Sequence, residues 1–255
     1  VGAYYYTTDR DELARASFEL NARLYPESLS ASASLVEFLM YAEMWADLSE
    51  EGRQAFEHFP QESAFLELAS VGDYNLGRYE EVLELCDKVL EVSPADSSKT
   101  LRAWSTKGDI YHQLGEPKKS YKAYDKALKI NPNYVYVLNN YAYYLSLHNE
   151  DLDKAEEMSY RTIRMEPENN VYLDTYAWIL FMQEKYEEAQ QYMDKVVPRE
   201  STEKFLLTDE YTSSVILEHA GDIAWMNGDA KRAVYLWQLA VKRGDEDATP
   251  LLQKK

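Results

Sequence analysis

The stretch LRAWSTKGDIYHQLGEPKKSYKAYDKALKINPNY, residues 101–134, decides the fold of this chain. Large and small apolar residues recur in it with the spacing of two successive helices, and a proline closes the second one. The positions that carry this pattern are Trp104, Gly108, Tyr111, Ser120, Tyr124, Ala127 and Pro132. Because small residues let two helices approach while large ones fill the gaps between them, the pattern predicts a packed helical hairpin.

The same 34-residue frame recurs along almost the whole chain when it is counted from the small residue that begins each second helix. Seven repeats result. The first is partial, and the second is degenerate because Gly52 stands where an aromatic residue is usual. Two segments fall outside the frame, a short insertion at 97–100 and a longer one at 198–213. The predicted repeats are 1–28, 29–62, 63–96, 101–134, 135–169, 170–203 and 214–247.

This frame resembles the tetratricopeptide repeat (TPR), a two-helix unit with small residues at positions 8, 20 and 27 and a closing proline. The resemblance implies an all-α fold, a right-handed superhelical solenoid of helix-turn-helix repeats. Since such repeats contact only their neighbours, residues 1–255 are expected to form a single extended domain. Solenoids of this kind expose long concave faces that hold partner chains, so the resemblance implies a non-catalytic interaction scaffold.

Both ends of the chain are expected to be incomplete as solenoid ends. The frame places Gly2 and Tyr5 at positions 8 and 11, so the chain is expected to begin inside a helix. It has no initiator methionine, and we expect the natural protein to extend upstream, where any signal or lipid-attachment segment would lie. At the other end, Leu251 and Leu252 are expected to fold back as a partial lid.

The composition fits a helical solenoid that keeps away from nucleic acid. The chain is 45% apolar, has only nine glycines, and contains no apolar run near the length of a membrane span. Its formal net charge of −18 repels phosphate backbones and anionic membrane surfaces, so neither nucleic acid nor such a surface is expected as a direct ligand. The lack of a long apolar run predicts no direct membrane insertion by this fragment. Basic or neutral partners fit this charge. A second interpretation of the acidic surface is that it only keeps the repeats in solution.

The sequence offers no catalytic, metal or cofactor motif. His58, His112, His148 and His219 are scattered over separate repeats and lack the spacing of zinc ligands. The segment 72–79 lacks the lysine and hydroxyl residue of a phosphate-binding loop, and 245–247 lacks the alternating ligands of a calcium loop. Cys86 falls in a core position of its repeat, which predicts a buried, unreactive thiol. The chain is therefore predicted not to be an enzyme and to need no cofactor.

A binding groove is predicted on the first helices of the last three repeats. The TPR resemblance implies that repeat positions 2, 5, 6, 9, 12 and 13 line the concave face. The predicted groove residues are Tyr136, Asn139, Asn140, Tyr143, Asp174, Trp178, Phe181, Glu218, Asp222 and Trp225. Aromatic side chains offer a large contact area at low entropic cost, and asparagine can bond a peptide backbone bidentately. Such a face suits an extended protein segment with apolar and basic residues.

Two features limit this interpretation of the groove. Positions 12 and 13 partly pack beneath the next repeat in this family, so Phe181 and Trp225 have a purely structural alternative. The carboxylate clamp with which chaperone-binding TPR proteins hold an acidic C-terminal tail is also missing. Its positions include Ser105, Asp109, Val171 and Thr175, and only Asn140 fits it.

A finer resemblance covers residues 138–243, in the blocks Asn139-Asn140-Tyr-Ala-Tyr-Tyr, Tyr172-Leu-Asp174-Thr-Tyr-Ala-Trp178 and Glu218-His219-Ala-Gly-Asp222-Ile-Ala-Trp225. These blocks resemble the C-terminal repeats of bacterial multi-TPR envelope proteins, often lipoproteins, some of which are adaptors for periplasmic proteases. The resemblance implies a protein of the bacterial periplasm or outer membrane, attached through an N-terminal segment outside this sequence. A cytoplasmic location is the alternative.

Several alternatives stay open at the level of sequence. The solenoid ends suggest a structural homo-oligomer, and aromatic faces also stack on sugars, which suggests a glycan-binding envelope protein. Within the insertion 198–213, Phe205, Leu206 and Leu207 either contact a partner or fold against the last two repeats. The partner, the biological process and the oligomeric state are not encoded in any pattern of the sequence.

Overall fold

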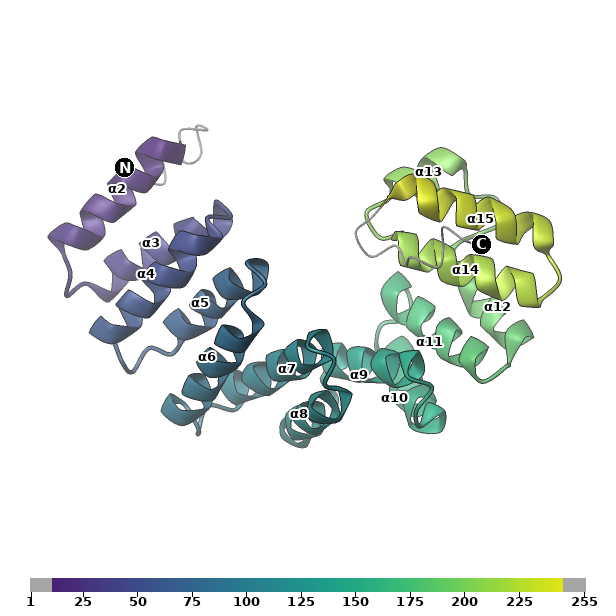
Figure 1. The fold of residues 1–255 in the computed structure, drawn as a ribbon, viewed down its shortest axis with the longest axis horizontal. Coiled ribbons are helices and arrows are strands. Elements are labelled where there is room, and N and C mark those ends of the chain that lie inside the picture. The colour runs from purple at the N-terminus through teal and green to yellow at the C-terminus, as the bar shows by residue number, and fades with distance from the viewer. Residues whose placement is uncertain (1–10, 245–255) are drawn as a thin grey trace. The chain divides into compact units, whose positions relative to one another are not determined.

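The computed structural model of the chain describes residues 11–244, which form fourteen helices and no strand. The helices follow one another as antiparallel hairpins joined by short turns (Figure 1). Within the described residues, no helix is long and apolar enough to cross a membrane. The predicted helix start around Gly2 and Tyr5, the acidic turn 245–247 and the lid of Leu251 and Leu252 lie outside the described residues.

The chain divides into two units, Val1–Pro132 and Asn133–Lys255, each with most of its contacts within itself. The prediction of one continuous domain over 1–255, with its repeat boundaries, stays a prediction. In the first unit, each second helix of a hairpin packs on the first helix of the next one. Its helices are α2 (Asp11–Leu24), α3 (Leu29–Tyr41), α4 (Trp45–His58), α5 (Ala64–Asn75), α6 (Tyr79–Val92), α7 (Ser97–Gln113) and α8 (Pro117–Ile130).

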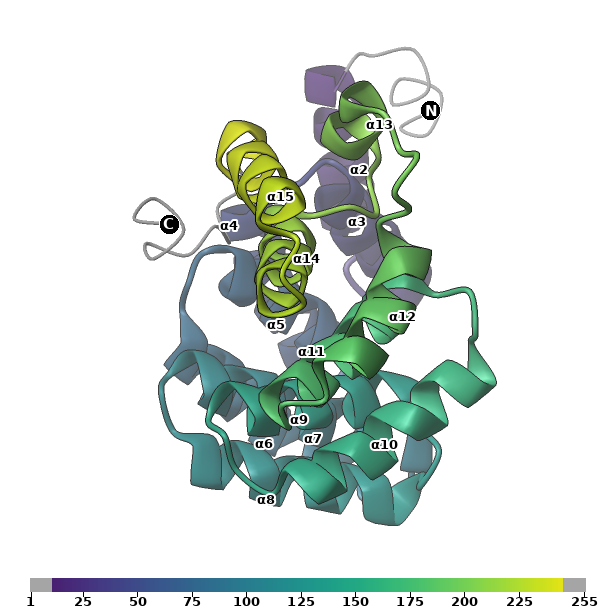
Figure 2. The ribbon, with the colours of Figure 1, turned by 90° about the vertical axis from the view of Figure 1, so that its right-hand side faces the viewer.

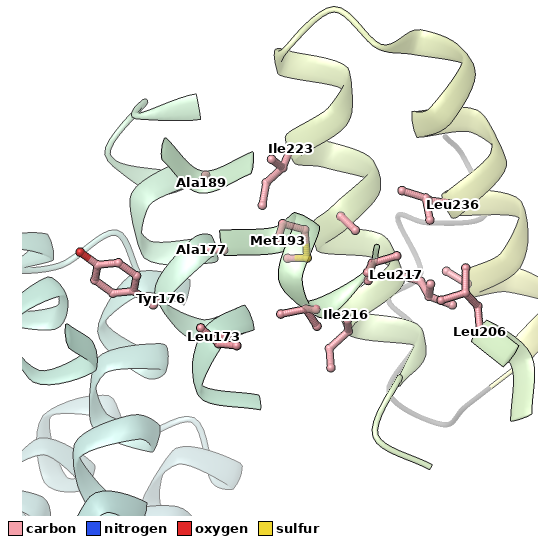
Figure 3. Packing of buried hydrophobic residues seen from close by; sticks show 14 of the residues in the cluster. Leu173, Tyr176, Ala177, Ala189, Met193, Leu206, Ile216, Leu217, Ile223 and Leu236 are labelled. Carbon is pink, nitrogen blue, oxygen red and sulfur yellow. The ribbon is translucent and has the colours of Figure 1, made fainter. Parts of the chain in front are cut away.

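The second unit contains three hairpins and one short additional helix (Figure 2). Its helices are α9 (Val135–Leu147), α10 (Leu152–Met165), α11 (Asn170–Met182), α12 (Tyr186–Val196), α13 (Glu203–Thr208), α14 (Ser214–Met226) and α15 (Ala230–Arg243). Buried side chains from α11, α12, α13, α14 and α15 form one apolar cluster, drawn in Figure 3. Tyr176 lies at the edge of this cluster with its hydroxyl directed away from it (Figure 3).

The four residues 97–100, which the repeat frame leaves as a short insertion, form the first turn of α7. Asp96 is the N-cap of that helix, and its carboxylate accepts hydrogen bonds from the backbone N–H groups of Ser98 and Lys99, both at 3.0 Å. An N-cap carboxylate satisfies donors that the helix leaves unpaired, which stabilises an added turn. The helix therefore begins one turn earlier than the frame.

The insertion 198–213 folds against the last hairpin through a six-residue helix, α13. Thr202 caps this helix, and Leu206 is fully buried in the apolar cluster of the second unit. The Arg243 guanidinium donates a hydrogen bond to the Leu206 carbonyl at 3.1 Å, which fixes α13 to the end of α15. Of the two alternatives left open for this segment, folding against the last repeats holds for Leu206, whereas Phe205 is exposed.

Glycine brings helices together at the second repeat, where the frame is weakest. A Cβ atom at Gly52 would lie 2.9 Å from the Phe65 carbonyl oxygen, and one at Gly72 would lie 2.6 Å from the Trp45 carbonyl oxygen. Neither backbone oxygen can move without displacing its helix. The two glycines thus permit α4 and α5 to pack closely, so Gly52 replaces the usual aromatic residue for a reason of packing.

Cys86 is buried among the side chains of the α5, α6 and α7 cluster, in line with its predicted core position. Burial raises the pKa of its thiol to about 12, against the weaker, opposite influence of Lys107. Since only the thiolate is nucleophilic, we expect alkylation of the native protein at pH 8 to be at least about a hundredfold slower than that of the urea-unfolded protein. Timed iodoacetamide labelling followed by mass spectrometry measures both rates, and equal rates would contradict the burial of this side chain.

Candidate functional site

The first helices of the three hairpins in the second unit lie side by side and carry all ten predicted groove residues. α9 packs on α11, and α11 packs on α14. Small residues at repeat position 8, Ala142, Ala177 and Gly221, are buried and allow the helices of each hairpin to approach. We call the surface formed by the ten residues on α9, α11 and α14, together with His219, the first-helix face.

The ten predicted residues differ in how far they reach the surface. Tyr136 and Trp225 are exposed, at 46% and 52% of their full accessibility. Asn139, Asp174 and Glu218, all at repeat position 5, are buried, because neighbouring first helices cover this position. The remaining predicted residues are half-buried, namely Asn140, Tyr143, Trp178, Phe181 and Asp222.

A buried polar pair joins α11 to α14 beneath the face. The Nδ1 atom of His219 lies 3.0 Å and 3.1 Å from the two carboxylate oxygens of Asp174, so the imidazole N–H donates to the carboxylate. Both side chains are less than a tenth exposed. The spacing of the four histidines in the sequence did not reveal this pair. The available signal was that positions 5 and 6 of consecutive first helices are spatial neighbours in a repeat stack.

Four aromatic rings form a continuous row across the three helices. The Trp178 ring stacks on the His219 imidazole, with centroids 4.0 Å apart and planes inclined by 14°. The Trp178 ring also stacks on the Phe181 ring, with centroids 4.8 Å apart and planes inclined by 16°. Tyr143 of α9 approaches the His219 ring at 6.1 Å. The row therefore contains residues from α9, α11 and α14, and Asp174 fixes the orientation of its central imidazole.

Two buried polar atoms at this face have no hydrogen-bond partner among the described residues. They are the indole Nε1 of Trp178, a donor, and the Oδ1 atom of Asn139, an acceptor. Native proteins pair almost all such groups, so an unpaired donor and an unpaired acceptor mark a place where water or a ligand supplies the missing bonds. A peptide group offers one acceptor and one donor, the complement of this set.

Two aromatic residues of the first-helix face, Phe181 and Trp225, differ in their attachment to the core. Phe181 packs against the apolar cluster of the second unit, which agrees with the structural alternative considered for it. Trp225 remains exposed, with its ring 5.8 Å from that of Trp237. Asp222 accepts a hydrogen bond of 2.9 Å from the Trp237 indole, so one of its oxygens is bound within its own hairpin. The exposed tryptophan is thus the member of the face most open to contact.

No group of three or more His, Cys, Asp or Glu side chains gathers as a metal site in residues 11–244. The chemistry that this face offers is aromatic stacking, hydrogen bonding and the negative charge of its carboxylates. These are means of binding a ligand, and they suit a peptide or protein segment.

Comparison with known proteins identifies the fold. Residues 95–204 match the family model described as the cytochrome c-type biogenesis protein H TPR domain. A TPR protein from Parabacteroides merdae superposes with a TM-score of 0.71 and 16% identity, over 99% of this chain and 93% of that one. PilF from Pseudomonas aeruginosa superposes with a TM-score of 0.64 and 16% identity, over 89% of this chain and 97% of that one. No match was found among curated protein sequences.

One further solved structure, YrrB, is described as a TPR protein with an unusual peptide-binding site. It superposes with a TM-score of 0.55 and 13% identity, over 87% of this chain and 97% of that one. These similarities define a class, the all-α helical-repeat solenoids. Within it, the chain is a multi-TPR protein, as its repeat frame predicted. The TPR fold is in general a non-catalytic scaffold for protein–protein interaction.

Proposed function

We propose that the chain is a scaffold that binds an extended segment of a partner protein along the first-helix face. The observation that carries the proposal is the aromatic row of Tyr143, His219, Trp178 and Phe181, which runs across all three first helices. Rigid aromatic side chains bury a large area at low entropic cost and dominate protein-binding energetics. The two unpaired atoms beside the row suit the main chain of such a segment.

The charge of the face favours a segment that carries basic residues between its apolar ones. Asp174, Glu218 and Asp222 contribute carboxylates to the face, and the net charge of the chain is −18. A basic segment is attracted by this charge during its approach, whereas an acidic one is repelled. The buried carboxylates act mainly through the field at the surface, since Asp174 already binds His219.

For the biological setting, we propose the assembly or processing of a protein complex in the bacterial cell envelope, with a periplasmic protease or another envelope complex as partner. The matching family model is described by its role in cytochrome c-type biogenesis. PilW, which superposes with a TM-score of 0.67 at 16% identity over 89% of this chain and 97% of that one, is described as a type IV pilus biogenesis factor. Both descriptions concern biogenesis, and the block resemblance of residues 138–243 supports an envelope protein.

The variant Tyr136→Ala with Trp225→Ala tests the first-helix face without disturbing its buried pair. Both side chains are exposed, so their truncation should leave folding intact. A display library of random peptides, selected on the wild-type chain, supplies binders whose affinity is then measured by fluorescence anisotropy. We expect the selected peptides to be rich in apolar and basic residues and to bind the variant at least about tenfold more weakly.

The matched control removes two exposed aromatic residues from the first unit, Tyr25→Ala with Tyr41→Ala. It should bind the selected peptides as the wild type does. Equal affinities of the wild type and the Tyr136/Trp225 variant would contradict binding at this face. Selection of sugars in a parallel glycan array, with no peptide binder, would favour the glycan alternative instead.

The proposed location is tested separately by fractionation of the native source cells. Immunodetection should find the protein with the periplasm or the outer membrane. Recovery in the cytoplasmic fraction, beside a cytoplasmic marker enzyme, would contradict the envelope proposal and leave the binding proposal untouched.

A further inference from the structure

The outer side of α6 carries a row of acidic residues. Glu80, Glu84 and Glu91 are exposed and follow one another at the spacing of a single helix face. The buried side of the same helix, with Val82, Cys86 and Val89 among others, faces the apolar cluster. The acidic row therefore lies on the solvent side of the hairpin.

The second helix of the next hairpin, α8, carries lysines at the same repeat positions. Lys118, Lys122 and Lys129 follow Glu80, Glu84 and Glu91 by 38 residues each, and all three are exposed. Ser120, Ala123 and Tyr124 form part of the buried side of α8. Two helices of one unit thus present opposite charges at matching positions.

The charge of this region contrasts with that of the chain. Residues 97–130 contain eight Lys and Arg against three Asp and Glu, whereas the whole chain contains 27 against 45. Within the described residues, no ion pair engages Glu80, Glu84, Lys118, Lys122 or Lys129, and Glu91 binds only Lys88 of its own helix. Each helix also carries an aspartate between the second and third residues of its row. Asp87, the aspartate of α6, is already paired with Lys107 at 2.5 Å.

We propose that two copies of this chain associate through these rows, with α6 of each copy lying on α8 of the other. A two-fold arrangement forms this contact twice, because each copy carries both the acidic and the basic row. When α6 lies parallel to the partner's α8, residues at equal repeat positions meet, and three Glu–Lys pairs form in each contact. The surface is complementary to itself.

Self-complementarity is the reason for choosing a second copy as the occupant. An acidic partner of another kind would use only the lysines and leave the acidic row of α6 without a role. The net charge of −18 drives copies apart at long range, but salt screens it beyond about 10 Å at 0.1 M ionic strength. The Glu–Lys pairs of the proposed contact are closer together than this distance, so they still attract one another. The expected association is weak and falls as salt concentration rises.

The test uses the whole chain and two charge-reversed variants. One variant carries Lys118→Glu with Lys122→Glu, the other Glu80→Lys with Glu84→Lys. Sedimentation equilibrium at low ionic strength should show a concentration-dependent dimer for the wild type and a monomer for each variant alone. An equimolar mixture of the two variants should form a heterodimer, because each reversed row then meets a complementary one.

Matched controls change the net charge equally at exposed positions outside the rows. They are Lys204→Glu with Lys231→Glu, and Glu187→Lys with Glu188→Lys, and both should dimerise as the wild type does. Circular dichroism checks that every variant is folded. We expect raising NaCl from about 0.05 M to about 0.5 M to weaken the dimer at least about tenfold.

Three results would overturn the proposal: a wild type that stays monomeric at low ionic strength, variants that dimerise alone, or a mixture that stays monomeric. Capture of an acidic protein that depends on Lys118 and Lys122 while the wild type remains monomeric would also overturn it, in favour of a different occupant. Peptide binding at the first-helix face is measured independently of all these outcomes.

Discussion

Replacement of Gly108 by leucine is expected to lower the free energy of unfolding by roughly 1–3 kcal/mol or more. A Cβ atom at this position would lie 2.3 Å from Cε1 and 2.4 Å from Cδ1 of the Tyr124 ring, well inside contact distance. Tyr124 is fully buried, and its hydroxyl donates a hydrogen bond to Asp109, so the ring has no room to withdraw. Urea unfolding followed by circular dichroism measures the loss.

Two further variants separate this clash from other effects of an added side chain. Gln113→Leu places a leucine on the same helix at an exposed position and should leave the free energy of unfolding nearly unchanged. Combining Gly108→Ala with Tyr124→Leu, which removes the clashing ring atoms, should cost less than the sum of the two single changes. Strict additivity would show that the two residues do not interact.

Replacement of Asp174 by alanine is expected to lower the free energy of unfolding by about 1–3 kcal/mol, because it leaves the buried Nδ1–H donor of His219 without its acceptor. The Trp178 ring stacks on this imidazole, so the change should also disturb the aromatic row. Thermal and urea unfolding measure the first effect. Near-ultraviolet circular dichroism, which reports on the surroundings of aromatic rings, measures the second.

The conservative variant Asp174→Asn keeps an acceptor oxygen within reach of His219 and should retain most of the stability. If the alanine and asparagine variants proved equally stable, the hydrogen bond would not be what holds α11 to α14. A loss of stability in Asp174→Ala without any change in the near-ultraviolet spectrum would contradict its role in orienting the aromatic row.

The helical hairpins were predictable because the repeat frame is a local pattern. The contact of Gly108 with Tyr124 follows from the small and large positions of one repeat, which lie only 16 residues apart. The added first turn of α7 was missed because the frame counts apolar positions and ignores capping. Asp96 and the residues after it carried that signal in their side-chain chemistry.

The candidate site was only partly predictable, since the repeat position of a residue does not give its exposure. Asn139, Asp174 and Glu218 share position 5 and lie buried between neighbouring first helices. The Asp174–His219 pair joins residues 45 positions apart, across the insertion that interrupts the frame. The repeat positions of the two residues indicated that they are neighbours, but the frame does not show how α13 and the loop around it return the chain to the stack.

The contact between a glycine and an aromatic ring also restricts how these repeats can diverge. Gly108 with Tyr124 and Gly221 with Trp237 occupy the same two repeat positions, which hold Ala177 and Met193 in the hairpin of α11 and α12. Suppose that a hairpin with alanine at the first position acquired the aromatic residue while the alanine was still present. The alanine methyl group would then lie about 2.3–2.4 Å from the ring. If glycine replaces the alanine first, the change leaves only a small cavity, which an aromatic ring can later fill. Mutational paths between the two kinds of hairpin therefore have a preferred order, in which glycine precedes the aromatic residue.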